Sequence, residues 1–261
     1  MPTQLSKQRK SVIVTGASGG IGRAVASVFL AHDHNVVLAG TSQDKLDALT
    51  RDLVAADGAA DRPARLLSVV IDAAQPADRI RLVETALARF GRIDVLVNNA
   101  GIFEPRPFLE VDEAHLDRFL EVNLKGTFFL TQAVVPHLKA AGGGAIVNIG
   151  TVLVDHAVAG VPASAAIASK GAIHALTTQL AAEFGRDNIR VNTIAPGIIR
   201  TPIHRRNGIE DADSLAGLHL LDRIGEPEEI ANLALLVAGS AFITGATLNV
   251  DGGHVAGHAL G

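Results

Sequence analysis

Residues 11–22 read SVIVTGASGGIG, a short apolar run that leads through a glycine-rich turn into a segment of helical period. Gly16, Gly20 and Gly22 permit a tight turn, and they let backbone N–H groups and a helix N-terminus approach a pyrophosphate. Glycine patterns of this kind also occur in turns that only pack, so the surrounding strand and helix are needed to interpret the pattern. The stretch predicts a strand–turn–helix unit with a candidate dinucleotide site.

The alternation of short apolar runs and longer helical segments continues along the chain. We expect strands over residues 11–16, 35–40, 64–72, 93–101, 144–150, 189–197 and 246–250. We expect helices over residues 20–32, 42–57, 75–90, 112–141, 164–184 and 226–239. Strands buried on both faces and separated by helices are typical of a parallel sheet. The pattern therefore predicts an α/β fold, a Rossmann-like doubly wound parallel sheet with helices on both faces, in a single domain over residues 1–261.

Local signals mark several helix ends and one irregular segment. Ser42 precedes its helix as an N-cap, and Gly91, Gly142 and Gly185 stand where helices should stop. Residues 202–222 fit the pattern least well, because they are first basic, then acidic, then apolar. Such a segment suits a mobile flap over a substrate site.

The composition excludes several classes of protein. The chain of 261 residues has a net charge of −4 and no cysteine, which argues against nucleic acid as a partner and against disulfides or thiolate metal sites. No apolar run reaches the roughly 18 residues of a membrane span, and residues 1–10 lack the apolar core of a signal peptide. His254 and His258 have helical spacing without an evident third ligand, so we predict no metal. We expect a cytoplasmic protein without a membrane partner.

Further motifs come after the glycine turn in a fixed order. They are NNAG at 98–101, VNLKGTF at 122–128, IVNIGT at 146–151, a lysine at 170, PGIIRT at 196–201 and ITGATLNVDGG at 243–253. This succession resembles the short-chain dehydrogenase/reductase family over essentially the whole chain. The resemblance implies a nicotinamide-dependent oxidoreductase that transfers a hydride between its cofactor and a small carbonyl, alcohol or imine compound.

The resemblance also implies which residues bind the dinucleotide. Asp72 corresponds to the contact with the adenine amino group, and residues 99–101 lie under the adenosine ribose. Each of these residues also has a purely structural interpretation, in which Asn99 braces the sheet and Thr201 caps the flap helix. The implied cofactor-binding residues are Gly16, Ser18, Gly20, Ile21, Gly22, Asp72, Asn99, Ala100, Gly101, Lys170, Pro196, Gly197, Ile199 and Thr201.

The end of the second expected strand bears on the choice of dinucleotide. A carboxylate there would bond the ribose 2′-hydroxyl and repel a 2′-phosphate. This chain has Gly40 at that position, followed by Thr41 and Ser42, whose hydroxyls could bond a phosphate. The arginine that often marks phosphate preference is missing at positions 19 and 41. We favour NADP(H) over NAD(H).

The reaction centre departs from the family's pattern. In the family a serine orients the carbonyl, a tyrosine moves the proton, a lysine binds the ribose and lowers the pKa of the tyrosine, and an asparagine holds a water. Asn123 and Lys170 match the asparagine and the lysine, and Thr151 stands in the place of the serine. The tyrosine position is Ala166, and the chain contains no tyrosine at all. This departure puts the family's proton transfer in doubt.

Three groups could replace the tyrosine as proton donor. His156 lies in the loop between Thr151 and the Lys170 helix, and an imidazole can give and take protons near neutral pH. A water linked to Lys170 and Asn123 is the other candidate, and Ser164 is a weaker one. Loss of general acid catalysis costs typically 10²–10⁴-fold in rate, so an activated carbonyl or an iminium carbon could still be reduced.

Alternative functions remain open. The chain could be a catalytically impaired dinucleotide-binding sensor or partner subunit, or a lyase or isomerase without net hydride transfer. The flap cations Arg200, His204, Arg205 and Arg206 could hold an anionic substrate or simply face water. Helices over residues 124–138 and 164–184 correspond to those that pair between subunits in the family. We expect a homo-oligomer, a tetramer or else a dimer.

Overall fold

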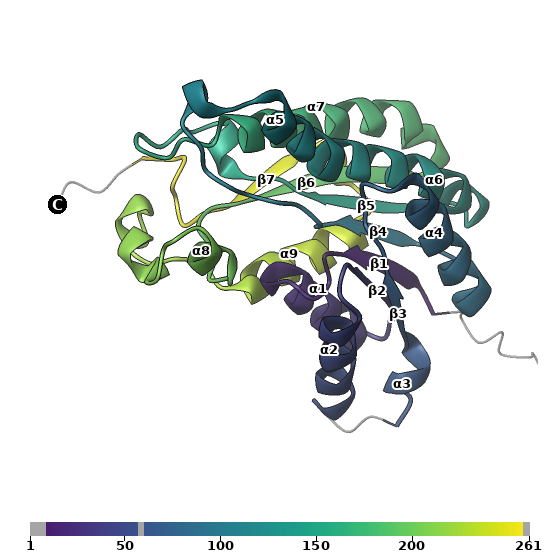
Figure 1. Cartoon of the computed structure of the whole chain (residues 1–261). Helices are drawn as coiled ribbons and strands as arrows, with labels where there is room; N and C mark the ends of the chain where they lie inside the picture. The colour runs from purple at the N-terminus through teal and green to yellow at the C-terminus, as the bar shows by residue number, and fades with distance from the viewer. Residues whose placement is uncertain (1–8, 57–59, 258–261) are drawn as a thin grey trace, which may run out of the picture.

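The computed structural model describes residues 9–56 and 60–257, and in these residues the apolar runs form one parallel sheet of seven strands (Figure 1). The strand order is β3-β2-β1-β4-β5-β6-β7. The strands are β1 (Ser11–Thr15), β2 (Asn35–Gly40), β3 (Leu66–Val70), β4 (Val95–Asn98), β5 (Gly144–Ile149), β6 (Ile189–Pro196) and β7 (Thr247–Val250).

Helices cover both faces of the sheet (Figure 1). They are α1 (Gly20–Ala31), α2 (Gln43–Ala55), α3 (Arg62–Arg65), α4 (Pro76–Phe90), α5 (Glu113–Phe119), α6 (Gly126–Ala140), α7 (Ser164–Phe184), α8 (Ile203–Arg206) and α9 (Pro227–Gly239). Val12 and Val14 of β1 point into the core with α1, α2 and α9. Ile13 between them points to the opposite core with α4, α6 and α7. The predicted doubly wound parallel sheet is confirmed.

The strand order determines where a binding site can lie. β1 pairs with β2 on one side and with β4 on the other, so the chain reverses its winding direction between β1 and β4. In open parallel sheets, ligands bind outside the carboxyl ends of the strands at this switch point. The loops after β1, β4, β5 and β6 meet there.

Several of the expected elements differ from the structure. The strand expected over 93–101 is shortened to Val95–Asn98. The strand expected over 64–72 begins only at Leu66, because Ala64 and Arg65 belong to α3, where buried Arg65 forms an ion pair with Asp33 at 3.0 Å. The helix expected over 112–141 is divided into α5, a π-helical turn at Leu120–Lys125 and α6. The end of the helix expected over 42–57 and His258 lie outside the described residues.

Several predicted helix ends are confirmed. The Ser42 hydroxyl accepts the backbone N–H of Lys45 at 3.4 Å and so caps α2. Gly91 ends α4 with a φ of +73°, a conformation that glycine adopts without strain. Gly185 is the C-cap of α7.

A buried polar chain links the carboxyl halves of three central strands. Asn98 of β4 donates to Asn148 of β5 at 2.9 Å, and Asn148 donates to Thr177 of α7 at 2.9 Å. The hydroxyls of Thr177 and Thr193 of β6 are 2.7 Å apart. All four residues are buried, so these bonds fix the strands relative to α7 in the region below the site.

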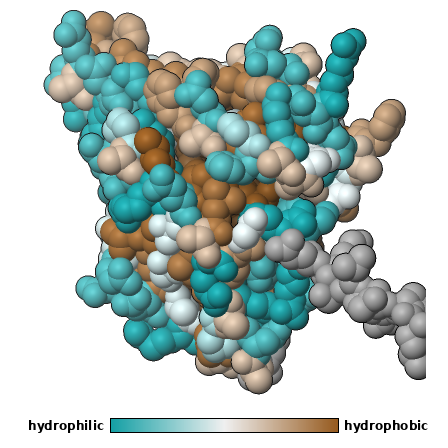
Figure 2. All heavy atoms as spheres, turned by 90° about the vertical axis from the view of Figure 1, so that its right-hand side faces the viewer, coloured by the Kyte–Doolittle hydropathy of each residue, from teal (hydrophilic) through white to brown (hydrophobic). Residues whose placement is uncertain are grey.

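The surface opposite the flap is mixed in polarity. Figure 2 shows that side of the molecule, with apolar atoms gathered between hydrophilic side chains. No helix within the described residues is long and apolar enough to cross a bilayer.

Candidate active site

The glycine turn after β1 is too tight for side chains at its key positions. Gly16 has a φ of +61°, and its carbonyl accepts the backbone N–H of Gly19 at 3.0 Å. A Cβ on Gly22 would lie 2.2 Å from the carbonyl oxygen of Gly16. The turn therefore needs glycine for backbone contact, and α1 begins directly after it at Gly20.

The loop after β4 is tied to this turn. The side-chain amide of Asn99 donates to the carbonyl oxygens of Thr15 at 2.9 Å and Gly16 at 3.1 Å. The hydroxyl of Thr15 accepts the backbone N–H groups of Asn99 and Ala100 at 2.9 and 3.0 Å. The amide of Asn99 thus braces the turn, and the backbone of residues 99 and 100 is held against Thr15.

The loop after β6 reaches the same place. A Cβ on Gly20 would lie 2.6 Å from Cγ2 of Thr201, so Thr201 lies against the first turn of α1. Ile199 is buried in the core beneath this loop. Pro196 ends β6, and the N–H of Gly197 donates to the carbonyl of Val250 at 3.0 Å. The structure therefore brings the motif at 196–201 against the glycine turn.

The residues at the expected adenosine end are also neighbours. A Cβ on Gly40 would lie 3.4 Å from the Ser18 hydroxyl oxygen, and Thr41 is exposed beside it. Asp72 is exposed at the end of β3, and its carboxylate accepts the N–H of Ala74 at 2.9 Å. The Ser42 hydroxyl is occupied as the N-cap of α2, so Thr41 presents the more accessible hydroxyl.

Lys170 projects from α7 toward the end of β5. Its ammonium donates to the carbonyl oxygen of Ile149 at 2.6 Å. Burial lowers the pKa of Lys170 to about 8. A Cβ on Gly101 would lie 3.4 Å from this ammonium nitrogen and 3.2 Å from the side-chain oxygen of Asn123. Lys170 and Asn123 therefore flank the same glycine at the loop after β4.

Asn123 lies in the π-helical turn and is completely buried. Its side chain exchanges two hydrogen bonds with the backbone of Ile102, at 2.8 and 3.2 Å, and donates to the Ser169 hydroxyl at 2.9 Å. These bonds tie the loop after β4 to α7. A π-helical turn interrupts the regular helical bonding and is common at functional sites. These three hydrogen bonds give the side chain of Asn123 a structural role.

Thr151 comes just after β5, and Ala166 lies in the first turn of α7. The Thr151 hydroxyl accepts the N–H of Leu153 at 3.3 Å and caps the short helix Val152–Val154. Ala166, one helical turn before Lys170, is 3% exposed and packs in an apolar cluster with Phe119, Ala163 and Ala165. Apolar side chains therefore surround the position at which the family pattern places its tyrosine.

His156 belongs to a series of three histidine rings. Its ring meets that of His254 edge-on, with centroids 5.2 Å apart, and the His254 ring lies 5.6 Å from that of His219. His219 in turn accepts the backbone N–H of Ile198 at 3.1 Å. These three rings connect the loop between β5 and α7 with the loop after β6.

Comparison with known proteins shows which family this chain is related to. Residues 16–255 match a family model described as enoyl-(acyl carrier protein) reductase. The 3-oxoacyl-[acyl-carrier-protein] reductase FabG of Thermotoga maritima is 34% identical over 248 residues, which cover 94% of this chain and 98% of that protein. The oxidoreductase UcpA of Escherichia coli O157:H7 is 35% identical over 254 residues, 94% of each chain.

The chain belongs to the short-chain dehydrogenase/reductase family. A third relative is the (2S)-[(R)-hydroxy(phenyl)methyl]succinyl-CoA dehydrogenase subunit BbsD of Thauera aromatica, 35% identical over 248 residues, 94% of this chain and 96% of that protein. The chain is accordingly a nicotinamide-dependent oxidoreductase by class.

In this short-chain dehydrogenase/reductase, residues 202–222, which we expected to form a flap, contain α8 and a 3₁₀ helix at Ala212–Leu218. Arg200 at its base bonds both carboxylate oxygens of Asp213, at 2.7 and 2.8 Å, and one of Glu226 at 2.8 Å. His204 bonds the carbonyl of Ile199 at 2.7 Å. Both side chains are therefore occupied, and Arg205 and Arg206 are exposed.

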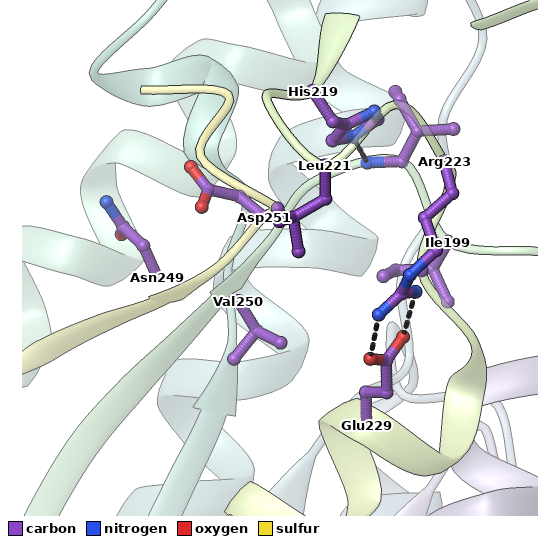
Figure 3. Close-up of a pocket in the computed structure, with 11 residues that line it drawn as sticks. Ile199, His219, Leu221, Arg223, Glu229, Asn249, Val250 and Asp251 are labelled. Carbon is purple, nitrogen blue, oxygen red and sulfur yellow. Dashed lines mark hydrogen bonds and ion pairs between the residues drawn. The ribbon is translucent and has the colours of Figure 1, made fainter. Parts of the chain in front are cut away.

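A cavity of about 260 Å³ lies between the loop after β6, the segment that leads into α9 and the end of β7 (Figure 3). The Arg223–Glu229 ion pair at 2.7 Å forms part of its wall. Lys170, Thr151 and Ala166 do not line this cavity. The cavity is lined by Ile198, Ile199, His219, Leu221, Arg223, Gly225, Glu229, Asn249, Val250, Asp251 and Gly252.

Sequence reasoning missed several polar partners in this member of the family. Ser169 links Asn123 to α7, and its place just before Lys170 was the only signal. His174 lies one turn after Lys170, and burial lowers its pKa, an effect that the Lys170 charge reinforces and Asp155 opposes. Its Nε2 has no hydrogen-bond partner among the described residues. No group of three or more metal-ligating side chains occurs within residues 9–56 and 60–257.

Proposed function

We propose that this chain is an NADP(H)-dependent oxidoreductase that acts between nicotinamide and the carbon of a small carbonyl, alcohol or imine compound, with a proton donor other than tyrosine. The observation that carries the proposal is the placement of Lys170, whose ammonium lies at the end of β5 beside Asn123 and Gly101. When bound, the nicotinamide supplies or accepts the hydride. The residues of the chain would bind the cofactor, orient the substrate and move the proton.

The glycine turn fits such a cofactor. Gly16 and Gly22 allow the backbone to close on itself, and the N-terminus of α1, which follows exposed Gly19, would face a pyrophosphate. Thr201, packed against Gly20, and Ile199 would hold the carboxamide end. The rest of the proposed binding set consists of Ser18, Ile21, Thr41, Ser42, Asp72, Asn99, Ala100, Gly101, Lys170, Pro196 and Gly197.

The preference for NADP(H) rests on the residues at the end of β2. Gly40 presents no carboxylate to repel a 2′-phosphate, and the Thr41 hydroxyl is exposed to receive one. The N-terminus of α2, which begins at Gln43, also favours an anion in front of it. NAD(H) is the other outcome of the binding measurement.

His156 is the proposed proton donor, with Thr151 orienting the substrate oxygen. His156 lies in the loop that begins at Thr151, and its ring contacts that of His254, which in turn contacts that of His219. Lys170 would bind the nicotinamide ribose, and its ammonium, with a pKa lowered to about 8 by burial, would hold charge near the transferred proton.

The test is NADPH-dependent reduction of activated carbonyls and cyclic imines, followed by the absorbance of the cofactor. We expect turnover by the wild type and a loss of about 10²-fold or more in the rate of His156→Ala. The control is His32→Ala, which should keep the wild-type rate, because His32 caps the end of α1 that is remote from the glycine turn. Turnover unchanged in His156→Ala would transfer the donor role to a water at Lys170. If no carbonyl or imine is turned over, the proposed oxidoreductase activity is wrong.

One observation favours a second function. Ala166 is buried among apolar side chains, so the surroundings of the family's tyrosine position are packed rather than polar. A dinucleotide-binding sensor or partner subunit without turnover would have this property. Cofactor binding without reduction of any carbonyl or imine would support it.

Two further expectations stay predictions. A homo-oligomer, tetramer or dimer, is supported by exposed Phe128 and Phe129 on α6, which are 41% and 42% exposed. Sedimentation of the purified protein measures this state. A cytoplasmic location is the other prediction.

A further inference from the structure

The imidazole of His219 is held in one chemical form. His219 lies directly after the 3₁₀ helix Ala212–Leu218 and is buried, with 3% exposed. Its Nε2 lies 3.1 Å from the backbone nitrogen of Ile198, and its Nδ1 lies 3.2 Å from the carbonyl oxygen of Ala216. A backbone N–H only donates and a carbonyl only accepts, so we assign a neutral ring with its proton on Nδ1.

This bond completes the support of the loop after β6. The carbonyl of Ile198 accepts the N–H of Gly225 at 2.8 Å, and the N–H of Arg200 donates to the carbonyl of Gly225 at 2.8 Å. Backbone partners therefore hold two of the loop's polar groups, whereas the N–H of Ile198 is held by a side chain. Loss of that acceptor would leave a partly buried donor without its partner.

The ring is also fixed by its neighbours. A Cβ on Gly197 would lie 3.0 Å from Nε2 of His219, and a Cβ on Gly252 would lie 3.2 Å from its Cβ. The end of β6 and the turn after β7 thus enclose the imidazole between two glycines. The ring of His254 lies on a third side, with centroids 5.6 Å apart.

We propose that His219 is a positioning residue that sets the loop from Ile198 to Thr201 for the dinucleotide by accepting the N–H of Ile198. The proposal rests on the function proposed above, because that function assigns Ile199 and Thr201 to the nicotinamide end. The consequence reaches the glycine turn, since Thr201 lies against Gly20.

Two amide variants separate the geometry of His219 from its polarity. In His219→Gln the side-chain oxygen can reach the position of Nε2 and accept the N–H of Ile198. In His219→Asn the oxygen corresponds to Nδ1 and cannot reach it. Both variants are neutral and polar, and circular dichroism and thermal melting check that each is folded.

Two readouts are measured on each variant: hydrogen exchange of the Ile198 amide without cofactor, by NMR, and the Kd for NADPH, by calorimetry. We expect His219→Gln to keep both values within about threefold of wild type, and His219→Asn to raise both the exchange rate and the Kd about tenfold. Equal values for the two variants, or unchanged exchange of Ile198 in His219→Asn, would overturn the proposal.

The readouts also separate this inference from the proposed function. If the wild type binds neither NADPH nor NADH, the proposed function is wrong and the positioning role falls with it. If the wild type binds NADPH and His219→Asn binds it equally well, the proposed function stands and the role of His219 is refuted.

Discussion

The ammonium of Lys170 donates a 2.6 Å hydrogen bond to the carbonyl oxygen of Ile149, and this bond joins α7 to the carboxyl end of β5. Burial of the ammonium lowers its pKa from the ordinary 10.5 to about 8. The charge of Lys170 is therefore costly to the folded state and is lost within the mildly alkaline range.

The first prediction concerns stability against pH. Between about pH 8 and 10.5 the unfolded chain binds a proton at Lys170 that the folded chain does not, so the free energy of unfolding rises with pH in this window. Across this pH window, the free energy of unfolding of the wild type should rise by on the order of 2 kcal/mol relative to that of Lys170→Met. Urea unfolding at pH 8, 9 and 10 measures the difference, and parallel pH profiles would contradict the lowered pKa.

Ala166→Tyr tests whether only the proton donor is missing. The phenol would stand one helical turn before Lys170, and a general acid there should raise carbonyl reduction about 10²–10⁴-fold. Ala166 is buried, so the larger ring should also lower stability by about 1–3 kcal/mol. Ala166→Phe fills the same volume without the hydroxyl, and equal activity in the two variants would show that the phenol adds nothing.

Gly22→Ala tests the closure of the glycine turn. The new Cβ would lie 2.2 Å from the backbone oxygen of Gly16, so we expect a loss of about 1–3 kcal/mol in stability and weaker NADPH binding. Gly185→Ala is the control, because a Cβ there meets no atom within 4 Å. Thermal melting compares them, and similar melting temperatures would refute the contact.

Thr177→Val tests the buried polar chain below the site. The substitution preserves shape but removes the acceptor of the Asn148 amide, so unfolding should become easier by about 1–3 kcal/mol. Thr178→Val is the same change on the exposed neighbour and should stay within about 0.5 kcal/mol of wild type. Urea denaturation measures both, and equal effects would mean that the chain contributes no stability.

The sheet could be predicted because burial on both faces leaves a simple signature. Val12, Ile13 and Val14 point alternately into two cores, so the whole run must be apolar. The start of β3 could not be predicted, because Arg65 adopts a helical turn and pairs with Asp33 from a distant loop. The π-helical turn at Leu120–Lys125 has no glycine or proline within it, although Gly126 follows it directly as its C-cap. Pro136 lies inside α6 without breaking it.

The candidate site was predictable as far as motifs reach. The pattern indicated Asn123 and Lys170, and the structure places both beside Gly101. It did not indicate His219, because its bond to Ile198 joins residues 21 positions apart with no motif spanning them. Contacts of this kind depend on how loops meet, which local sequence does not encode.

The proposed function depends on a dinucleotide site built from the glycine turn, Lys170 and the loop after β6. Calorimetric titration of the wild-type protein with NADPH and with NADH tests this site most directly, since the chain has neither tryptophan nor tyrosine for a fluorescence measurement. We predict micromolar binding that is tighter for NADPH. Tighter binding of NADH would contradict the preference assigned to Gly40 and Thr41, and binding of neither dinucleotide would contradict the site itself.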